Sequence, residues 1–598
     1  MIADTLASLL LARAEDDRPG LVHEGRVWSW REHVAACLAA GARLSARGIG
    51  THVGVLSENV PELVVLIGGA ALAGHVVVAL NPTRSVDELI RDARATDVDL
   101  VLADESCGGI GRAVSEALGV TALPLASEAN STAPEDAVRS EGVVPAPGDL
   151  VMLIFTSGTS GRPRAVRITQ RKLALPGASL AALLTPEDAV YCSMPLFHSG
   201  ALMAAYAPAV ASGAALVLRR RFSASGLLPD IRRYGCTYLH YVGKALSYVL
   251  ATPEQPDDAA NPLKIAFGNE GSAVAVRRFG ERFGCRVIDA FGSTETAISL
   301  IPDPSGPPGC LGRLPEGVRI LNPFTTRPCP PARIEDGRLL NPDEAIGELV
   351  NTAGLGLFEG YYNDPDADAE RIRDGAFWSG DLAYQDADGY VFFAGRGTER
   401  LRVDGENLAV APIEAALREF GGVVEAAVYP VPDPAAGDQV MAALVLAGTP
   451  DPGASASGAP DPAASDPAVS GPAVSGPAVS GPAVSGPAAL DPAASGRAAS
   501  GRAASGPAVF DPVVFAAFLA SRRDLGAKSL PRFIRLCREL PQTASHKVIK
   551  RHLARDAWRT TDPVWMRGPD GLRLLTEADV KGIEEEFVRH GRQHLLET

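Results

Sequence analysis

The chain has 598 residues, too many for one compact domain, and 46% of them are hydrophobic, enough to bury a large core. Its formal net charge of -15 argues against a nucleic-acid partner and against a general attraction to anionic lipid. The eight cysteines form no CxxC pair and no Cys/His cluster, which favours buried free thiols in a reduced compartment.

The first part of the chain alternates β-rich runs with helical patterns. No basic region precedes the apolar residues of 1–20, so this segment predicts an amphipathic helix and not a signal peptide. LVHEGRVWSW (21–30) predicts two strands around a tight turn, and residues 31–49 predict a helix. The most apolar stretch, 64–80, contains His75 and several glycines, which suits a buried helix, turn and strand better than a membrane span.

The same rhythm continues through DLVLAD, LVLRRR, TYLHYV, KIAFGN and RVIDAFG. Strand-helix-strand repeats predict a parallel sheet covered by helices. After about residue 395 the pattern becomes that of a small α+β unit. We therefore expect an α/β fold, with a large N-terminal domain over residues 1–395 and a small α+β C-terminal domain over residues 396–447 and 512–598.

Residues 448–511 interrupt the small domain with Pro, Ala, Gly, Ser and Asp, including a pentapeptide repeat near SGPAV. Almost no Leu or aromatic residue is present to offset the entropy of ordering, roughly 1–2 kcal/mol per residue. We expect a disordered insertion in a surface loop, with a docking tether as the alternative.

A short polar loop follows an apolar run in IFTSGTSGRPRAV (154–166). Its hydroxyls, backbone N–H groups and two Arg side chains suit a polyphosphate. It is not a Walker loop, because Gly158 and Gly161 are three apart and no Lys follows. Taken alone, a loop rich in Ser, Thr and Gly is more often a plain connection between two elements, with no ligand.

Five further segments follow in order: MPLFHSG (194–200), FGSTET (291–296), WSGDL (378–382), GRGTERLRVDGENL (395–408) and TASHKVIK (543–550). With TSGTSGRPRAV (156–166) they resemble the motifs of the adenylate-forming (ANL) superfamily, which includes acyl-CoA synthetases, luciferases and peptide-synthetase adenylation domains. The resemblance covers the whole chain apart from the repeat insertion. It implies ATP, Mg²⁺ and CoA as cofactors and a C-terminal domain that rotates about a hinge.

The resemblance also assigns roles to individual residues. Glu295 would bind magnesium between ATP phosphates, Asp381 would accept from both ribose hydroxyls, and Lys547 would offset charge where carboxylate and α-phosphate meet. The plainer alternatives are a solvated loop acid for Glu295 and one of several basic residues for Lys547. The implied sites are catalytic Lys547, Glu295 and Thr294; nucleotide-binding Thr156, Ser157, Gly158, Thr159, Ser160, Gly161, Arg164, Gly268, Asn269, Glu270, Phe291, Gly292, Ser293, Asp381 and Arg396; acyl-pocket His198, Tyr241 and Gly243; and CoA-path or hinge Thr398, Gly405, Glu406 and Asn407.

Three segments narrow the choice within the superfamily: LRRRFSAS (218–225), CTYLHYVGKALSYVL (236–250) and KIAFGNEG (264–271). They resemble the fatty acid transport protein / very-long-chain acyl-CoA synthetase branch. The chain departs from that branch at three positions, with Arg164 in place of Lys, Lys244 in place of Glu and Thr398 in place of the hinge Asp. The membrane-spanning N-terminus of the animal members has no counterpart.

The leading hypothesis is therefore an ATP-dependent ligase that joins CoA to a long or very long chain fatty acid through an acyl-AMP intermediate. One alternative is transfer to an acyl carrier protein or activation of a bulky steroid or secondary-metabolite carboxylate. Another is a non-catalytic lipid-binding module. We expect a cytoplasmic enzyme that has no transmembrane segment and touches membranes at most peripherally, and a homodimer is left open.

Overall fold

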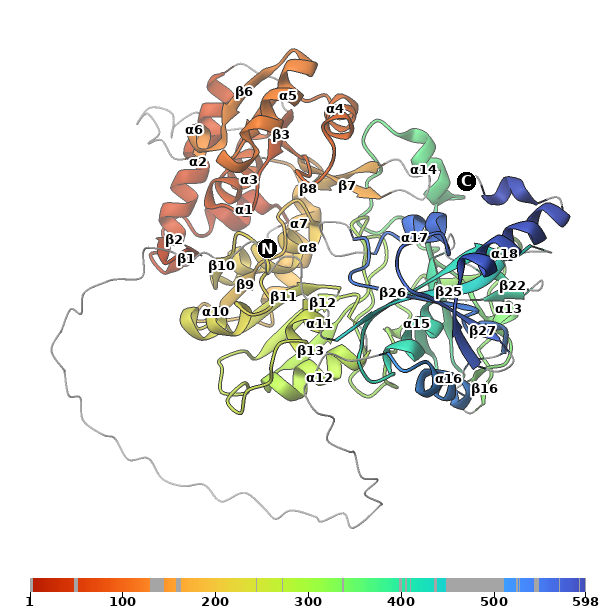
Figure 1. The fold of residues 1–598 in the computed structure, drawn as a ribbon. Helices are drawn as coiled ribbons and strands as arrows, with labels where there is room; N and C mark the ends of the chain where they lie inside the picture. The colour runs from red at the N-terminus through yellow and green to blue at the C-terminus, as the bar shows by residue number, and fades with distance from the viewer. Residues whose placement is uncertain are drawn as a thin grey trace, which may run out of the picture.

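The structure is a computed structural model that describes residues 4–47, 52–129, 145–157, 163–243, 245–271, 273–335, 338–396, 401–403, 406–408, 410–434, 438–447, 510–522, 525, 527–542, 548–568, 571–590 and 592–596. The N-terminus is marked near the middle of Figure 1, the red and orange elements extend to the upper left, and the blue elements of the C-terminal region lie at the right. Within the described residues, no helix combines the length and the apolar character needed to cross a membrane.

Two mostly parallel sheets form the N-terminal region, as the strand-helix rhythm predicts. The six-stranded sheet has the order β6-β5-β3-β4-β7-β8, and only β7 and β8 are antiparallel. The seven-stranded sheet has the order β13-β12-β11-β9-β10-β1-β2, and only β1 and β2, the expected tight pair, are antiparallel. The strands are β1 Pro19–His23, β2 Arg26–Ser29, β3 His52–Leu56, β4 Val76–Ala79, β5 Leu100–Ala103, β6 Thr121–Pro124, β7 Leu150–Ser157, β8 Pro163–Thr169, β9 Ala189–Cys192, β10 Ala215–Leu218, β11 Tyr238–Val242, β12 Ile265–Asn269 and β13 Arg286–Asp289.

Helices pack on these sheets and start at recognisable signals. Ser29 caps α2 in a capping box with Glu32, which satisfies backbone N–H groups that the first turn would leave unpaired. Gly74 ends α3 in the left-handed conformation, so the predicted helix, turn and strand at 64–80 is confirmed. The helices are α1 Leu6–Leu11, α2 Trp30–Ala46, α3 Pro61–Ala73, α4 Val86–Ala95, α5 Gly108–Leu118, α6 Leu125–Ala129, α7 Gln170–Ala181, α8 Ser199–Ala201, α9 Ala207–Ser212, α10 Leu227–Tyr234, α11 Ala245–Leu250 and α12 Ala273–Phe283.

A third, antiparallel sheet was not expected from the sequence. Its main path is β14-β21-β20-β18-β15, and β19 pairs with β20. Its members are β14 Gly312–Arg313, β15 Val318–Leu321, β18 Gly347–Asn351, β19 Ile372–Arg373, β20 Ala376–Gln385 and β21 Tyr390–Arg396, with the small β16 Ile334–Glu335 and β17 Arg338–Leu339 pair, α13 Pro342–Ala345 and α14 Pro365–Arg371 nearby in the chain.

The C-terminal region is the expected small α+β unit, drawn in cyan and blue in Figure 1. Its five-stranded sheet has the order β24-β25-β26-β27-β28, and β25 and β26 run parallel although the predicted insertion separates them in the chain. The elements are β22 Leu401–Val403, β23 Glu406–Leu408, α15 Val410–Arg418, β24 Val423–Pro432, β25 Asp438–Leu446, α16 Pro512–Ser521, β26 Phe533–Cys537, α17 Lys550–Asp556, β27 Val564–Gly568, β28 Gly571–Leu574 and α18 Glu577–Arg589.

The insertion lies outside the described residues except at its end. Phe510 packs against the rings of Phe515 and Trp565, and the side chain of Asp511 caps α16. Residues 510 and 511, which the sequence assigns to the insertion, therefore already pack with α16 and β27.

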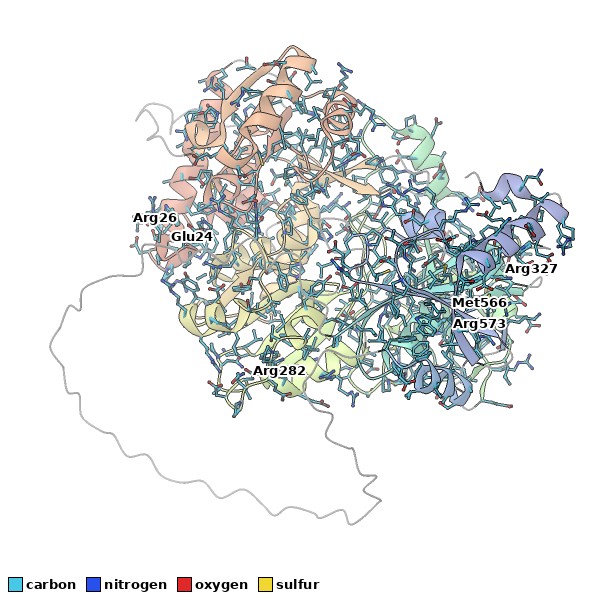
Figure 2. All side chains as sticks on the ribbon, viewed as in Figure 1. Glu24, Arg26, Arg282, Arg327, Met566 and Arg573 are labelled. Atoms are coloured by element: carbon cyan, nitrogen blue, oxygen red, sulfur yellow. The ribbon has the colours of Figure 1, made fainter. Side chains whose placement is uncertain are left out.

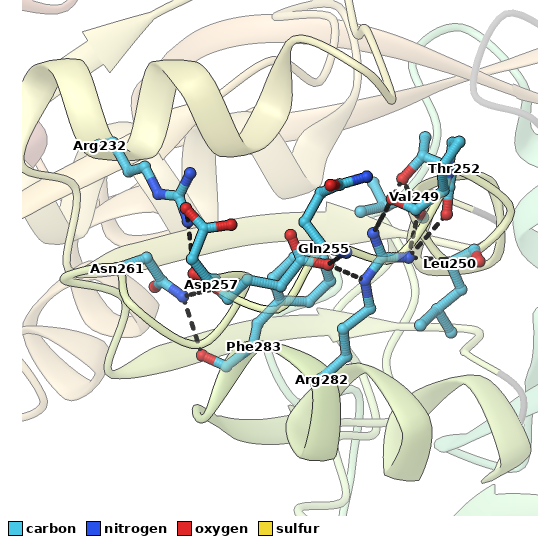
Figure 3. Close-up of polar contacts among 11 residues, drawn as sticks. Arg232, Val249, Leu250, Thr252, Gln255, Asp257, Asn261, Arg282 and Phe283 are labelled. Atoms are coloured by element: carbon cyan, nitrogen blue, oxygen red, sulfur yellow. Dashed lines mark hydrogen bonds and ion pairs between the residues drawn. The ribbon is translucent and has the colours of Figure 1, made fainter.

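A buried arginine ties α12 to the end of α11. Arg282 lies on α12 (Figure 2), and Figure 3 shows its guanidinium turned toward the segment after α11. The guanidinium pairs with Asp258 at 2.6 Å and donates to the carbonyls of Val249 and Thr252 at 3.3 and 2.9 Å. These bonds satisfy carbonyls at the end of α11 that the helix cannot pair itself.

Candidate active site

The predicted phosphate loop connects two paired strands. β7 ends at Ser157 and β8 begins at Pro163, and Thr156 lies opposite Arg164 in the antiparallel register. The loop residues Gly158, Thr159, Ser160 and Gly161 lie outside the described residues, as does the side chain of Ser157. The hairpin nevertheless shows where the loop must start and end, at one edge of the six-stranded sheet.

Arg164 on β8 is only 4% exposed. Its guanidinium forms an ion pair with Glu370 of α14 and lies over the ring of Tyr361, 5.4 Å from the ring centroid. Its Nη1 atom is buried without a hydrogen-bond partner. The predicted nucleotide contact of Arg164 therefore depends on this remaining nitrogen, and it stays a prediction.

Tyr361 joins the hairpin to the predicted metal ligand. Its backbone forms an isolated antiparallel bridge with Val166 of β8, and its side chain is 3% exposed. The hydroxyl donates to Oε1 of Glu295 at 2.9 Å. Glu295 lies in the loop after β13, so this hydrogen bond links the two sheets at the site.

The surroundings of Glu295 keep its carboxylate ionised. Burial opposes ionisation, but hydrogen bonds from its own backbone N–H, Tyr361 and Ser293, together with the positive charge of Arg371, hold its pKa below the usual value. Among the described residues, no three His, Cys, Asp or Glu side chains gather as a metal site. A Mg²⁺ ion at Glu295 would thus take its other ligands from phosphate oxygens and water, the set this ion prefers.

Lys172 adds a buried positive charge near this carboxylate. It lies in the first turn of α7, directly after β8, and is 0% exposed. Its Nζ donates to the carbonyl of Arg167 at 3.2 Å and lies 5.8 Å from the centre of the Phe358 ring. Burial lowers the pKa of Lys172 to about 8, while the negative charges of Glu295 and Glu359 oppose that shift.

The predicted adenine loop, residues 268–271, begins with the last two residues of β12. A side chain at Gly268 would collide with the carbonyl and ring of Tyr241, so only glycine allows this approach of β12 to β11. Glu270 adopts a left-handed backbone with φ of 62°. Oδ1 of Asn269 is buried without a hydrogen-bond partner, which suits an amino donor such as that of adenine.

Asp289, at the end of β13, holds this loop in place. Its Oδ2 accepts from the backbone N–H of Gly271 and from the hydroxyl of Tyr241, both at 2.7 Å. Burial raises the pKa of Asp289 to about 6, although both hydrogen bonds favour the ionised form. Asp289 therefore connects the predicted adenine loop to Tyr241, a predicted acyl-pocket residue.

The loop 291–296 makes two contacts that place its predicted nucleotide residues. The backbone of Phe291 pairs with that of Leu300, and its ring lies 6.2 Å from the ring of Phe393. The hydroxyl of Thr294 lies 2.9 Å from that of Ser199 in α8, directly after His198. Thr294 is therefore beside the predicted acyl segment, while Gly292 and Ser293 lie between these two anchors.

Of the three predicted acyl residues, Tyr241 lines a small, largely apolar cavity. Tyr241 and its strand neighbours line it from β11, and α10 and α11 close it through Leu227, Leu246 and Val249. His198 accepts from the N–H of Gly200 at 3.2 Å, and Gly243 has φ of 56° just beyond β11. The cavity has a volume of about 10 Å³, room for about one water molecule, so a large acyl group would need its walls to move.

The two predicted ribose residues lie opposite each other. Asp381 of β20 and Arg396 of β21 are register partners, and Asp381 is 7% exposed. The side chain of Arg396 is outside the described residues, as are those of Glu406 and Asn407 on the β22–β23 hairpin. Thr398, Gly405 and Lys547 also lie outside them, so their predicted roles stay predictions.

Four residues of the site were not singled out from the sequence: Tyr361, Lys172, Asp289 and Ser199. Tyr361 follows a glycine in GYYNDP, just before a Pro-initiated helix, and this was a usable signal for a fixed aromatic residue. Lys172 gave no such signal, because a Lys in an amphipathic helix is usually solvated. Its burial follows from the packing of α7.

Comparisons with known proteins identify the family of the chain. The profile of the AMP-binding enzyme family matches residues 11–362. Steroid-22-oyl-CoA synthetase from Rhodococcus jostii is 41% identical, covering 99% of both chains. Medium/long-chain-fatty-acid--CoA ligase FadD17 from Mycobacterium marinum is 42% identical over 94% of this chain and 99% of its own.

The human long-chain fatty acid transport protein 6 is a more distant relative, 27% identical over 70% of this chain and 73% of its own. Among solved structures, ATP-bound MatB from Rhodopseudomonas palustris superposes with a TM-score of 0.72 at 22% identity, covering 93% of this chain and 98% of MatB. The predicted α/β fold with a small C-terminal domain is thereby confirmed.

Proposed function

This chain belongs to the AMP-binding enzyme family and is an AMP-forming acid–thiol ligase; we propose that it joins CoA to a large hydrophobic carboxylate, with long-chain fatty acids as the first candidates. ATP, Mg²⁺ and CoA are the cofactors of this family. The observation that carries the proposal is the Tyr361–Glu295 contact at the end of the phosphate-loop hairpin. An ionised carboxylate close to the strands that flank the predicted phosphate loop supports a metal-bound polyphosphate as the ligand.

The reaction has two steps. In the first, an oxygen of the substrate carboxylate attacks the α-phosphorus of ATP, the bond to the bridging oxygen breaks, and pyrophosphate leaves with acyl-AMP formed. In the second, the CoA thiol loses its proton and attacks the acyl carbon, and AMP leaves with acyl-CoA formed. Bringing a carboxylate to a polyphosphate requires positive charge, which Lys547 would supply at the reacting atoms.

The chain's own residues would hold these reactants. Glu295 would bind Mg²⁺, which neutralises phosphate charge, and Tyr361 would keep the carboxylate oriented. Thr294 would donate to the α-phosphate, and Asp381 would accept from the ribose hydroxyls. Asn269 would meet the adenine edge with its buried Oδ1 atom.

The substrate class rests on apolar lining and on relatives. The cavity beside Tyr241 is lined mainly by apolar residues, Leu227, Leu246 and Val249 among them, and this lining supports an alkyl or steroid group once the walls move apart. The FadD17 relative is named for medium and long fatty acids, and it supports the first candidate. The steroid-22-oyl-CoA synthetase relative matches over almost the whole chain and supports a steroid side-chain acid as the second.

A panel assay tests both candidates. Pyrophosphate release is measured with ATP, Mg²⁺ and each acid, with and without CoA, and products are identified by mass spectrometry. The panel contains acetate, octanoate, palmitate, lignocerate and a C22 steroid carboxylic acid. Palmitoyl-CoA or lignoceroyl-CoA as the main product supports the fatty-acid proposal, and a preferred steroid thioester selects the second candidate.

Other outcomes have defined meanings. Acyl-AMP that accumulates and ignores CoA would point to an acyl carrier protein as the acceptor. If no acid gave pyrophosphate release, the proposal would be refuted, and the alternative of a non-catalytic lipid-binding module would be favoured. Glu295→Gln should abolish release in a folded protein, and the matched control Glu316→Gln, at an exposed loop carboxylate, should leave it unchanged.

A further inference from the structure

A contact between the N-terminal and C-terminal regions begins at Tyr248 on α11. Its hydroxyl donates to Oε1 of Glu425 on β24 at 2.7 Å. The amide nitrogen of Gln542 donates to the Tyr248 hydroxyl at 2.7 Å and to Oε1 and Oε2 of Glu425 at 3.2 and 3.3 Å. We call Tyr248, Glu425 and Gln542 the interdomain cluster.

Glu425 is the buried member of the cluster, 3% exposed, while Tyr248 and Gln542 are half-buried. The two donors stabilise its carboxylate where little water reaches it. Hydrogen bonds to an ionised group in such a setting are stronger than neutral ones, and they are directional. The cluster therefore fixes where β24 and Gln542 sit against α11.

Gln542 lies at the base of the segment that carries Lys547. Gln542 and Val548 form an isolated antiparallel bridge, and the N–H of Ile549 donates to the carbonyl of Pro541 at 2.7 Å. Residues 543–547 therefore start and end at one anchored point. The contacts of Gln542 therefore also determine where the chain enters the segment that carries Lys547.

The same short helix also reaches the apolar cavity. Leu246 and Val249 of α11 line that cavity, while Tyr248 contacts Glu425 and Gln542. α11 thus joins the wall of the predicted acyl pocket to the base of the Lys547 segment. The C-terminal end of α11 is held by Arg282, whose guanidinium donates to the carbonyls of Leu250 and Thr252 (Figure 3). Leu250 is two residues after Tyr248, so this end of the helix is fixed.

We propose that Tyr248 is a positioning residue for the adenylation step: it holds Glu425 and Gln542 against α11, and Gln542 directly precedes the segment that carries Lys547. This inference rests on the proposed function, in which Lys547 acts during acyl-AMP formation. The second step, attack of the thiol on acyl-AMP, does not need Lys547 at the α-phosphate. Loss of the Tyr248 hydroxyl should therefore separate the two steps.

The test is Tyr248→Phe, measured in each half-reaction apart. Adenylation is followed by ATP–pyrophosphate exchange with palmitate or the C22 steroid acid, whichever the wild type prefers. Thioester formation is followed with the corresponding synthetic acyl-adenylate and CoA. Loss of a hydrogen bond to a buried charge predicts about a ten- to hundredfold fall in the exchange rate constant. Thioester formation should stay within about twofold of wild type, since no bond needed for it is removed.

Tyr234→Phe, which removes a hydroxyl from the neighbouring helix α10, is the matched control and should change neither step. A second readout needs no activity: hydrogen exchange at the Ile549 amide should be faster in Tyr248→Phe and unchanged in Tyr234→Phe. An equal loss in both half-reactions, no loss in either, or unchanged exchange at Ile549 would overturn the proposal. If the wild type exchanged no pyrophosphate with any acid, the proposed function would fail, and the amide measurement would still decide whether Tyr248 anchors this segment.

Discussion

Replacing Lys172 by Met is expected to make the protein more stable at neutral pH and less active. Met has nearly the length of Lys and fills the same buried space on α7 without a charge. Lys172 is surrounded by apolar groups such as Phe358, and the negative charges of Glu295 and Glu359 only partly offset its burial. The substitution removes this penalty and, with it, a positive charge close to the predicted metal ligand.

The magnitude follows from the pKa. A fall from 10.5 to about 8 corresponds to about 3 kcal/mol of unfolding free energy. The lost hydrogen bond to the carbonyl of Arg167 costs about 1 kcal/mol. Lys172→Met should therefore gain about 2 kcal/mol at pH 7.

The same pKa shift also determines how the stability difference between wild type and Lys172→Met changes with pH. At pH values well below 8, Lys172 is charged in both folded and unfolded protein, so the full penalty applies to the wild type. Between about pH 8 and pH 10.5, the folded protein holds fewer protons than the unfolded chain, and the wild type becomes more stable as pH rises. The advantage of the Met variant should shrink by about 2 kcal/mol between pH 7 and pH 9.5.

Urea unfolding followed by tryptophan fluorescence at pH 7 and pH 9.5 measures this difference. Lys581→Met, at an exposed position on α18, is the control and should show no pH-dependent gap. Pyrophosphate exchange on the same samples should fall in Lys172→Met, since the carboxylate of Glu295 loses a nearby positive charge. A gap that is the same at both pH values would refute the buried-charge reasoning, whatever its size.

Two further predictions follow from contacts of the site and the core. Tyr361→Phe should slow adenylation about ten- to hundredfold, because the carboxylate of Glu295 loses a hydrogen-bond donor. The variant should also need a higher Mg²⁺ concentration for half-maximal rate, and an unchanged Mg²⁺ dependence would argue against Glu295 as the metal ligand. Arg282→Ala should lower the free energy of unfolding by about 3–5 kcal/mol, because it leaves Asp258 buried without its cation. Arg278→Ala on the same helix, at an exposed position, should change stability little, and equal effects in the two variants would contradict the capping role of Arg282.

The sequence was sufficient for the parts of the fold that repeat a local pattern. Alternating strand and helix periods predicted both parallel sheets, and the change of pattern after residue 395 predicted the α+β unit. The antiparallel sheet that includes β20 and β21 was missed, because its long strands are interrupted by turns and short helices without a clear period. The register that sets Asp381 opposite Arg396 depends on the turn between β20 and β21 and on an irregularity between Leu382 and Ala383, and this irregularity has no clear signal in the sequence.

The residues of the candidate site also fall into those that a local motif predicts and those that only the folded chain reveals. Motifs identified the carboxylate Glu295, but its donor Tyr361 is brought to it only by the bridge between residue 361 and β8. Asp289 was likewise visible as one acid in a strand, and nothing local indicates that it holds the 268–271 loop and Tyr241 together. Residues that act on a ligand are found by motif, and residues that position them are found only once the chain is folded.

Several features that reduce stability lie where the chemistry is expected. Lys172 is charged in an apolar setting, and Asp289 is a half-buried acid with a raised pKa. Arg164 Nη1, Asn269 Oδ1 and His240 Nε2 are buried polar atoms without a partner, and each lies on a strand or loop of the site. Each such group weakens the folded state unless another group compensates it. A nucleotide and an acid would supply donors, acceptors and charge to such atoms. Ligand binding should therefore raise the melting temperature of the wild type more than that of Lys172→Met, because the variant has already lost the cost of one buried charge.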